Sequence, residues 1–290
     1  MDPVLFELGP IHLWYYGLAY AIGLLTIDQW VRRRRGYLGW SQRDVSDFSL
    51  LFAVSILVGG RALDIVVYDW DYYREHPWQL LGFWQGGMAT HGVLLGAAVG
   101  TALLCWWRNK SFLGIADEIV IPGAFLLALG RIGNHINGEV YGSVTDVSWA
   151  VEFPHVTGHR HPVALYDGVK NLLIVLILLY VQRKPHRPRG LLLGHFVFWY
   201  GFLRLFTDYF RVYDYYWLGV GRGQYLNLLM AALGLGIIFF LRRVARQEFE
   251  EGDEHRDAQE VGNTSWVKRA LFYALLAFCL FIPSGTTQWF

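Results

Sequence analysis

The sequence predicts an all-α polytopic membrane protein with about seven to eight transmembrane helices and a small periplasmic segment. Hydrophobic residues make up 54% of the 290-residue chain and aromatic residues 17%, whereas only 17% are charged. The apolar residues gather in repeated runs of about 20, the length that a helix needs to cross the hydrocarbon core of a bilayer. A soluble protein with a large core seldom shows so many long runs, and the net charge of +1 gives no indication of a nucleic-acid partner.

Basic clusters between the apolar runs predict the orientation of the helices, because Lys and Arg collect in the cytoplasmic loops of membrane proteins. A run of four arginines, Arg32 to Arg35, follows the first apolar run, and similar clusters follow the third, fifth and seventh. All of these clusters fall on one side of an eight-span arrangement, so the N-terminus is predicted on the outer side. The eight runs are residues 11–30, 48–68, 88–107, 115–137, 162–182, 191–210, 225–241 and 270–282.

The charge distribution divides the chain into three parts. Residues 1–246 are predicted to form a transmembrane domain, residues 247–266 a charged cytoplasmic linker, and residues 267–290 an additional C-terminal transmembrane helix. Short strands are expected within the polar outer segment 139–161. The Trp- and Tyr-rich segment 69–87 is typical of the interfacial region of a membrane protein.

Residues 130–142, with the sequence GRIGNHINGEVYG, place charged and amide side chains at the end of the fourth apolar run. Charged groups at membrane depth are costly, rare and usually functional. Arg131 and Asn134 are three residues apart and therefore share one helical face. Gly138 lies just past the polar group and is expected to end the helix. The segment therefore predicts a helix that ends at a polar site in or near the bilayer.

Arg131 and Arg204 are the two arginines that fall within this polar setting. One interpretation is that they are neutralised by Glu139 and Asp208 and serve only as scaffold. The other is that they bind an anion, because the arginine fork matches phosphate and the phosphates of a membrane are lipid head groups. The second interpretation is favoured. Arg204 lies near the middle of its span and is expected to face the interior of the bundle.

His91 lies at the start of the third span, within the glycine-rich segment 86–92. A structural interpretation is a neutral imidazole that is hydrogen-bonded to a neighbouring span. A functional interpretation is a general base, because a desolvated imidazole is neutral and can accept a proton. The flanking glycines favour the functional interpretation, since they allow a ligand to approach closely.

Taken together, these residues resemble the bacterial prolipoprotein diacylglyceryl transferases. The resemblance covers about residues 4–241, and its motifs occur in the order that the family has. It departs from the family pattern at His135, at Asp208 and in the last apolar run. The matching motifs are residues 130–139, His91-Gly92-Val93-Leu94-Leu95-Gly96, Arg160-His161-Pro162 with Leu165-Tyr166, Tyr200-Gly201 with Arg204, and Gly223-Gln224.

The resemblance implies an enzyme of the bacterial inner membrane with a periplasmic N-terminus. Such an enzyme moves the diacylglyceryl group of phosphatidylglycerol onto the lipobox cysteine thiol of a prolipoprotein signal peptide, and glycerol phosphate leaves. This is the first step of lipoprotein maturation. No metal and no soluble cofactor is expected, because the lipid already carries its leaving group.

The resemblance also implies roles for individual residues. His91 would take the proton of the acceptor thiol, Arg131 and Arg204 would stabilise the departing phosphate, and Asn134 with Glu139 would orient Arg131. The candidate catalytic residues are His91, Arg131, Arg204 and Glu139, and the candidate substrate-binding residues are Arg131, Asn134, Asn137, Gly142, Tyr16, Tyr200, Arg61 and His161.

Three other functions stay open at this point. A transporter or flippase would bind anionic lipid through the arginines without chemistry, and a divergent paralogue would use another acceptor. A non-catalytic lipoprotein-binding or assembly protein would make no lipidated product. The two cysteines, Cys105 and Cys279, are expected to be inert, because they lie far apart in apolar runs without the CxxC spacing of metal or redox sites.

Overall fold

The computed structural model describes residues 3–8, 11–67, 70–82, 87–154, 156–184, 187–212, 216–217, 220–248 and 266–283. The chain divides into two compact units. One comprises Asp2–Ile115 together with Asp257–Phe290, and the other comprises Ala116–Arg256. The first is called here the N-terminal unit and the second the C-terminal unit.

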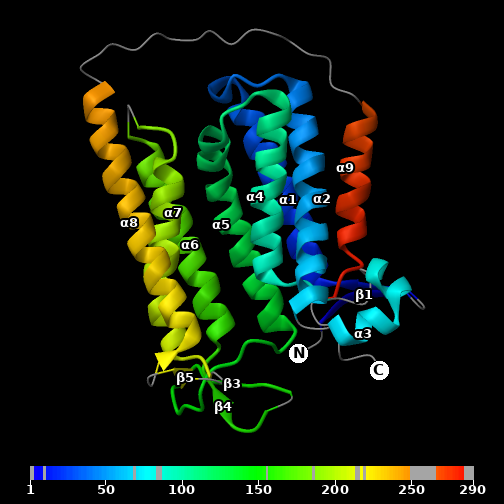
Figure 1. Ribbon diagram of the computed structural model, residues 1–290. Helices are drawn as coiled ribbons and strands as arrows, with labels where there is room; N and C mark the ends of the chain where they lie inside the picture. The colour runs from blue at the N-terminus through cyan, green and yellow to red at the C-terminus, as the bar shows by residue number, and fades with distance from the viewer. Residues whose placement is uncertain are drawn as a thin grey trace. The chain divides into compact units, whose positions relative to one another are not determined.

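In the N-terminal unit, three long helices and one short helix run alongside one another (Figure 1). The helix α2 is central, since it packs on α1, α4 and α9. An antiparallel hairpin of β1 and β2 precedes α1. The elements of this unit are β1 (Val4–Leu8), β2 (Ile11–Trp14), α1 (Tyr15–Leu38), α2 (Gln42–Val67), α3 (Trp70–Glu75), the 3-10 helix η1 (Pro77–Leu81), α4 (Thr90–Arg108) and α9 (Trp266–Cys279).

Glycines allow α2 and α4 to pack closely. A Cβ added to Gly59 would lie 2.5 Å from the carbonyl oxygen of Gly92 and 2.8 Å from the Cα of Gly96, so the two backbones are in direct contact. The start of α2 is fixed by a capping box, in which the Ser41 hydroxyl accepts the Asp44 N–H at 3.2 Å and the Asp44 carboxylate accepts the Ser41 N–H at 3.0 Å.

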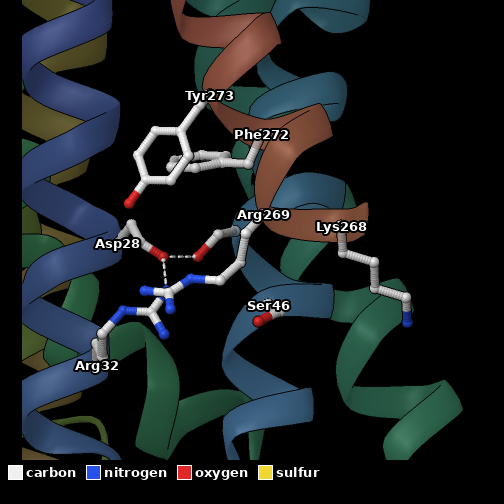
Figure 2. Close-up of a pocket in the computed structure, with 8 residues that line it drawn as sticks. Asp28, Arg32, Ser46, Lys268, Arg269, Phe272 and Tyr273 are labelled. Atoms are coloured by element: carbon white, nitrogen blue, oxygen red, sulfur yellow. Dashed lines mark hydrogen bonds and ion pairs between the residues drawn. The ribbon is translucent and has the colours of Figure 1, made fainter. Parts of the chain in front are cut away.

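The C-terminal helix α9 packs against α1 and α2. The N–H of Trp14 donates to the carbonyl of Leu280 at 3.0 Å, and Gly17 packs against the backbone carbonyl of Cys279. Lys268 on α9 pairs with Asp47 on α2. Figure 2 shows a pocket in this region, in which Asp28 and Arg32 of α1 face side chains of α9. These contacts make α9 an integral part of the N-terminal unit.

In the C-terminal unit, α7 packs on α6 and, more extensively, on α8. Gly201 on α7 makes this contact close, because a Cβ there would lie 2.5 Å from the carbonyl oxygen of Asn227 on α8. Asp117 on α5 fixes the start of α7 by accepting the backbone N–H groups of Gly190 and Leu193, each at 2.9 Å. The elements are α5 (Phe112–Ile136, which begins in the N-terminal unit), β3 (Val151–Glu152), β4 (His159–Arg160), α6 (Val163–Gln182), α7 (Leu191–Tyr209), β5 (Tyr216–Trp217), β6 (Val220–Gly221) and α8 (Arg222–Glu248).

The predicted fold class is confirmed: the protein is an all-α polytopic membrane protein with short strand pairs. Four helices are long and apolar enough to cross a membrane, and a shorter apolar helix covers Gly92–Arg108. The other predicted spans are helical over the same regions, but α1 carries the arginine run, α7 carries Arg204 and Asp208, and α9 is only 14 residues long. The four helices are Gln42–Val66, Phe112–Ile136, Val163–Gln182 and Gly223–Arg243.

Several boundaries differ from the predicted ones. The first helix begins at Tyr15 and not at residue 11, because residues 11–14 pair with β1 as a strand. Segment 70–81 contains α3 and η1, although only an interfacial region was predicted there. The short strands expected in the segment 139–161 are confirmed as β3 and β4. Most of the predicted charged linker lies outside the described residues, since these resume at residue 266.

Candidate functional site

The carboxylate of Asp167 on α6 is the centre of a buried charged cluster in the C-terminal unit. Its side chain is 1% exposed, and three cations surround it. Arg131 Nε lies 3.4 Å from Oδ2, Arg204 pairs with the same oxygen, and Lys170 Nζ lies 3.4 Å from Oδ1. The hydroxyl of Thr207 also donates to Oδ1, at 2.8 Å. One carboxylate therefore connects α5, α6 and α7 through charge.

A second carboxylate extends the cluster to α8. Arg204 Nε lies 3.0 Å from Asp208 Oδ1, one helical turn away on α7. The amide of Asn227 on α8 donates to the other oxygen of Asp208 at 2.7 Å. Both Arg204 and Asp208 are buried, with 7% and 2% of their surface exposed. Arg204 is thus held from two sides, and the prediction that it faces the interior is confirmed.

Arg131 is positioned by the end of α5. Arg131 donates to Asn134 Oδ1 at 3.3 Å, and the Asn134 amide donates to Glu139 Oε2 at 2.9 Å. The backbone turns back at this point because Gly138 has φ +72° and the Glu139 N–H donates to the Asn134 carbonyl at 2.8 Å. This is the geometry of a Schellman motif, which requires a left-handed residue after the helix. The predicted helix break at Gly138 is confirmed, and the break is what returns Glu139 to Asn134.

The loop after α5 is packed tightly around Gly142. The N–H of Gly142 donates to the carbonyl of His161 at 2.9 Å. A Cβ at this position would lie 2.6 Å from both the Phe210 carbonyl oxygen and a methyl group of Val163. The ring of His161 packs against that of Phe210 in a tilted arrangement, with centroids 4.7 Å apart, and its Nδ1 lies 3.0 Å from the Tyr166 hydroxyl. Only glycine fits at residue 142 without displacing this loop.

The arrangement is suited to binding an anion. Three cations, Arg131, Lys170 and Arg204, contact two carboxylates, Asp167 and Asp208, and a third carboxylate, Glu139, reaches Arg131 through Asn134. Cations that outnumber the carboxylates in direct contact with them, away from water, favour a ligand of opposite sign. Guanidinium groups are the side chains that match phosphate oxygens in a bidentate manner.

The structure brings four of the predicted residues into one network, namely Arg131, Asn134, Glu139 and Arg204. Tyr200 joins it indirectly, because its ring lies 3.9 Å from Lys170 Nζ. Asn137 follows the last residue of α5, where its N–H donates to the Gly133 carbonyl at 3.0 Å. Its role in substrate binding, like those of Gly142 and His161, stays a prediction.

The other three predicted residues belong to the N-terminal unit. The hydroxyl of Tyr16 is buried and lies 3.3 Å from that of Tyr20. Arg61 is 2% exposed and donates to the Gln79 carbonyl at 2.9 Å, so it anchors η1 to α2. His91 lies in the first turn of α4, and its side chain is outside the described part of the chain.

Asp167 is an acidic partner of Arg131 in the structure, whereas the scaffold interpretation of the sequence offered Glu139. Glu139 reaches Arg131 through Asn134. Asp167 and Lys170 were not predicted as site residues. The available signal was two opposite charges three residues apart within the apolar run 162–182.

The chain is similar to one family of known proteins. The family model described as prolipoprotein diacylglyceryl transferase matches residues 3–240. A phosphatidylglycerol–prolipoprotein diacylglyceryl transferase from Pseudoalteromonas translucida is 36% identical over 260 residues, which cover 86% of this chain and 96% of the relative. Enzymes of the same name from Geobacter sulfurreducens and Nitrosomonas europaea are 38% and 36% identical, over 84% and 83% of this chain and 96% and 90% of their own lengths.

Proposed function

The chain belongs to the prolipoprotein diacylglyceryl transferase family, and on that premise we propose that its buried arginines bind the phosphate of the lipid substrate. The protein is a transferase that moves the diacylglyceryl group of phosphatidylglycerol to a prolipoprotein, the reaction for which its relatives are named. The observation that carries the proposal is the cluster in which Arg131 and Arg204 meet at Asp167.

The reaction builds negative charge on the leaving group. The acceptor sulfur forms a bond to the glycerol carbon of the diacylglyceryl group, and the bond between that carbon and the phosphate oxygen breaks. The electron pair stays on the oxygen, and glycerol phosphate leaves. Arg131 and Arg204 hold the phosphate and stabilise the charge that develops there. Because carboxylates and neighbouring helices already fix both guanidinium groups, little reorganisation is needed when the lipid binds.

Glu139 and Asn134 act on the reaction through Arg131. Asn134 accepts from the guanidinium at 3.3 Å, and Glu139 fixes Asn134 by accepting from its amide at 2.9 Å. The phosphate then takes the remaining N–H groups. Asn137, Gly142, Tyr16, Tyr200, Arg61 and His161 are proposed to contribute to the binding of the two substrates.

His91 is proposed to take the proton of the acceptor thiol, because only the thiolate is a strong nucleophile. His91 lies in the first turn of α4, and an imidazole is the side chain most suited to this role near neutral pH.

The acceptor is proposed to be the lipobox cysteine of a prolipoprotein signal peptide. The location is proposed to be the bacterial inner membrane with the N-terminus in the periplasm. The basic clusters support this orientation, since they fall on one side of the predicted spans.

One assay tests the proposal. Purified protein in detergent or in phosphatidylglycerol vesicles is given a lipobox peptide, and both the lipidated peptide and free glycerol phosphate are measured. The protein as it stands should release the two products in equal amounts. Absence of both products would refute enzymatic activity and favour a lipid transporter.

Two substitutions then separate the residue roles. Arg204→Lys retains the charge and removes the fork, so it should lower the rate at least 100-fold if the fork holds the transition-state phosphate. His91→Asn should lower it as strongly. Exposed residues offer matched controls, and Arg183→Lys and His76→Asn should keep the full rate. A fully active Arg204→Lys or His91→Asn variant would rule out the role proposed for that residue.

A further inference from the structure

Lys170 is a buried cation that neither the sequence motifs nor the family resemblance account for. It lies on α6, and its side chain is 3% exposed. Its ammonium is 3.4 Å from Asp167 Oδ1 and 3.9 Å from the ring centroid of Tyr200. Its Nζ has no hydrogen-bond partner of good geometry among the described residues.

Such a group is expensive, because a lysine loses its hydration when it is buried. The need to pair Asp167 with a cation does not by itself explain why Lys170 is buried here. Asp167 already has Arg204 and Arg131 on Oδ2 and the hydroxyl of Thr207 on Oδ1. A leucine or methionine at residue 170 would fill the same volume in an apolar helix at no electrostatic cost.

The two oxygens of Asp167 have different partners. Both arginines contact Oδ2, whereas Lys170 and Thr207 contact Oδ1. A phosphate that binds the arginines must approach the Oδ2 side, where the carboxylate would repel it. An ammonium on the opposite oxygen offsets this repulsion.

We propose that Lys170 is a positioning residue for the lipid phosphate: it neutralises Asp167 from the side away from the arginines, so that Arg131 and Arg204 can be shared with an anionic head group. Without Lys170, the two arginines would directly contact an equal number of carboxylates, Asp167 and Asp208, and no cation would face Asp167 from its Oδ1 side. This inference rests on the proposed phosphate site and adds a residue that sets its preference for an anion.

The experiment compares Lys170→Met, Lys170→Arg and Lys170→Met/Asp167→Asn in the complete protein. The probe is glycerol phosphate, whose inhibition constant against phosphatidylglycerol reports phosphate binding directly. In Lys170→Met, inhibition should weaken about 10-fold or more and the KM for phosphatidylglycerol should rise, whereas the KM for the peptide should stay within about twofold. One charge interaction of about 1.4 kcal/mol corresponds to that tenfold change.

The two other variants test the charge argument. Lys170→Arg keeps the cation, so its inhibition constant for glycerol phosphate should stay within about threefold of that of the unchanged protein. The double variant removes the carboxylate together with its neutraliser, so it should regain most of the lost affinity for glycerol phosphate. Lys184→Met is the matched control, because it makes the same substitution at an exposed position just after the end of α6.

Two results would overturn the inference. One is an unchanged inhibition constant in Lys170→Met. The other is a double variant that binds glycerol phosphate no better than Lys170→Met, which would indicate a purely structural lysine. Arg204→Gln distinguishes this failure from failure of the phosphate site itself. If Arg204→Gln also leaves inhibition by glycerol phosphate unchanged, the arginines do not bind phosphate. If Arg204→Gln abolishes inhibition, the phosphate site stands and only the role proposed for Lys170 is refuted.

Discussion

Asn134→Asp is the sharpest test of how Arg131 is held. Asn134 accepts from Arg131 at 3.3 Å and donates to Glu139 at 2.9 Å. An aspartate has the same shape, but it cannot donate, so its carboxylate would face that of Glu139. The substitution therefore improves one contact of Arg131 and places two like charges side by side.

The magnitude follows from the geometry. Two like charges about 4 Å apart repel by about 4 kcal/mol at an effective dielectric constant of about 20. The new attraction between the aspartate and Arg131 offsets about half of this. A net cost of about 2 kcal/mol corresponds to a ~30-fold loss of rate if it is felt in the transition state.

The assay is the initial rate of peptide lipidation, with a second substitution as the rescue. In Asn134→Asp/Glu139→Gln the glutamine amide can donate to the aspartate, which restores the bond between these two residues in the opposite direction, while Arg131 still donates to residue 134. The double variant should recover to within about fivefold of the unchanged protein. The reasoning is refuted if Asn134→Asp keeps the full rate, or if the double variant is slower than the single one.

Three further substitutions test the packing around the site and between the helices. Gly142→Ala should lower the lipidation rate at least 10-fold, because its methyl group would lie 2.6 Å from the Phe210 carbonyl oxygen, and an unchanged rate would show that the loop yields easily. Gly17→Ala should lower the melting temperature in detergent, because the added methyl group would overlap a backbone carbonyl at the end of α9. Gly36→Ala is the control and should leave the melting temperature unchanged, because its methyl group meets no described atom within 4 Å. Equal melting temperatures for the two variants would contradict this packing. Asp117→Ala removes two hydrogen bonds from the start of α7 and should lower the free energy of unfolding by about 1–3 kcal/mol, and a chemical-denaturation midpoint equal to that of the unchanged protein would contradict it.

The positions of the long helices could be predicted because a membrane helix depends on a local property, the length of an apolar run. The ends could be predicted less well. Residues 11–14 are as apolar as the helix that follows, and only their pairing with Val4–Leu8 makes them a strand. The capping box that starts α2 at Gln42 lies outside the apolar run and was therefore missed.

The site could be predicted in part, for a similar reason. Arg131, Asn134 and Glu139 are neighbours in sequence, so their network follows from helical spacing and one glycine turn. Asp167 and Lys170 lie more than thirty residues away from Arg131, and their part in the cluster depends on how α5, α6 and α7 pack. A pattern of residues cannot specify which carboxylate meets which arginine when several are available.

The shared role of Asp167 affects how any substitution of the arginines should be interpreted. This carboxylate holds α5, α6 and α7 together and also orients both guanidinium groups. Removal of one arginine therefore leaves a buried carboxylate less well paired, and that alone is destabilising by several kcal/mol. An inactive Arg131→Ala variant does not separate loss of the phosphate ligand from loss of the helix contact. Substitutions that keep the charge, such as Arg204→Lys, preserve the ion pair while they remove the fork, so the rate that they lose measures phosphate recognition.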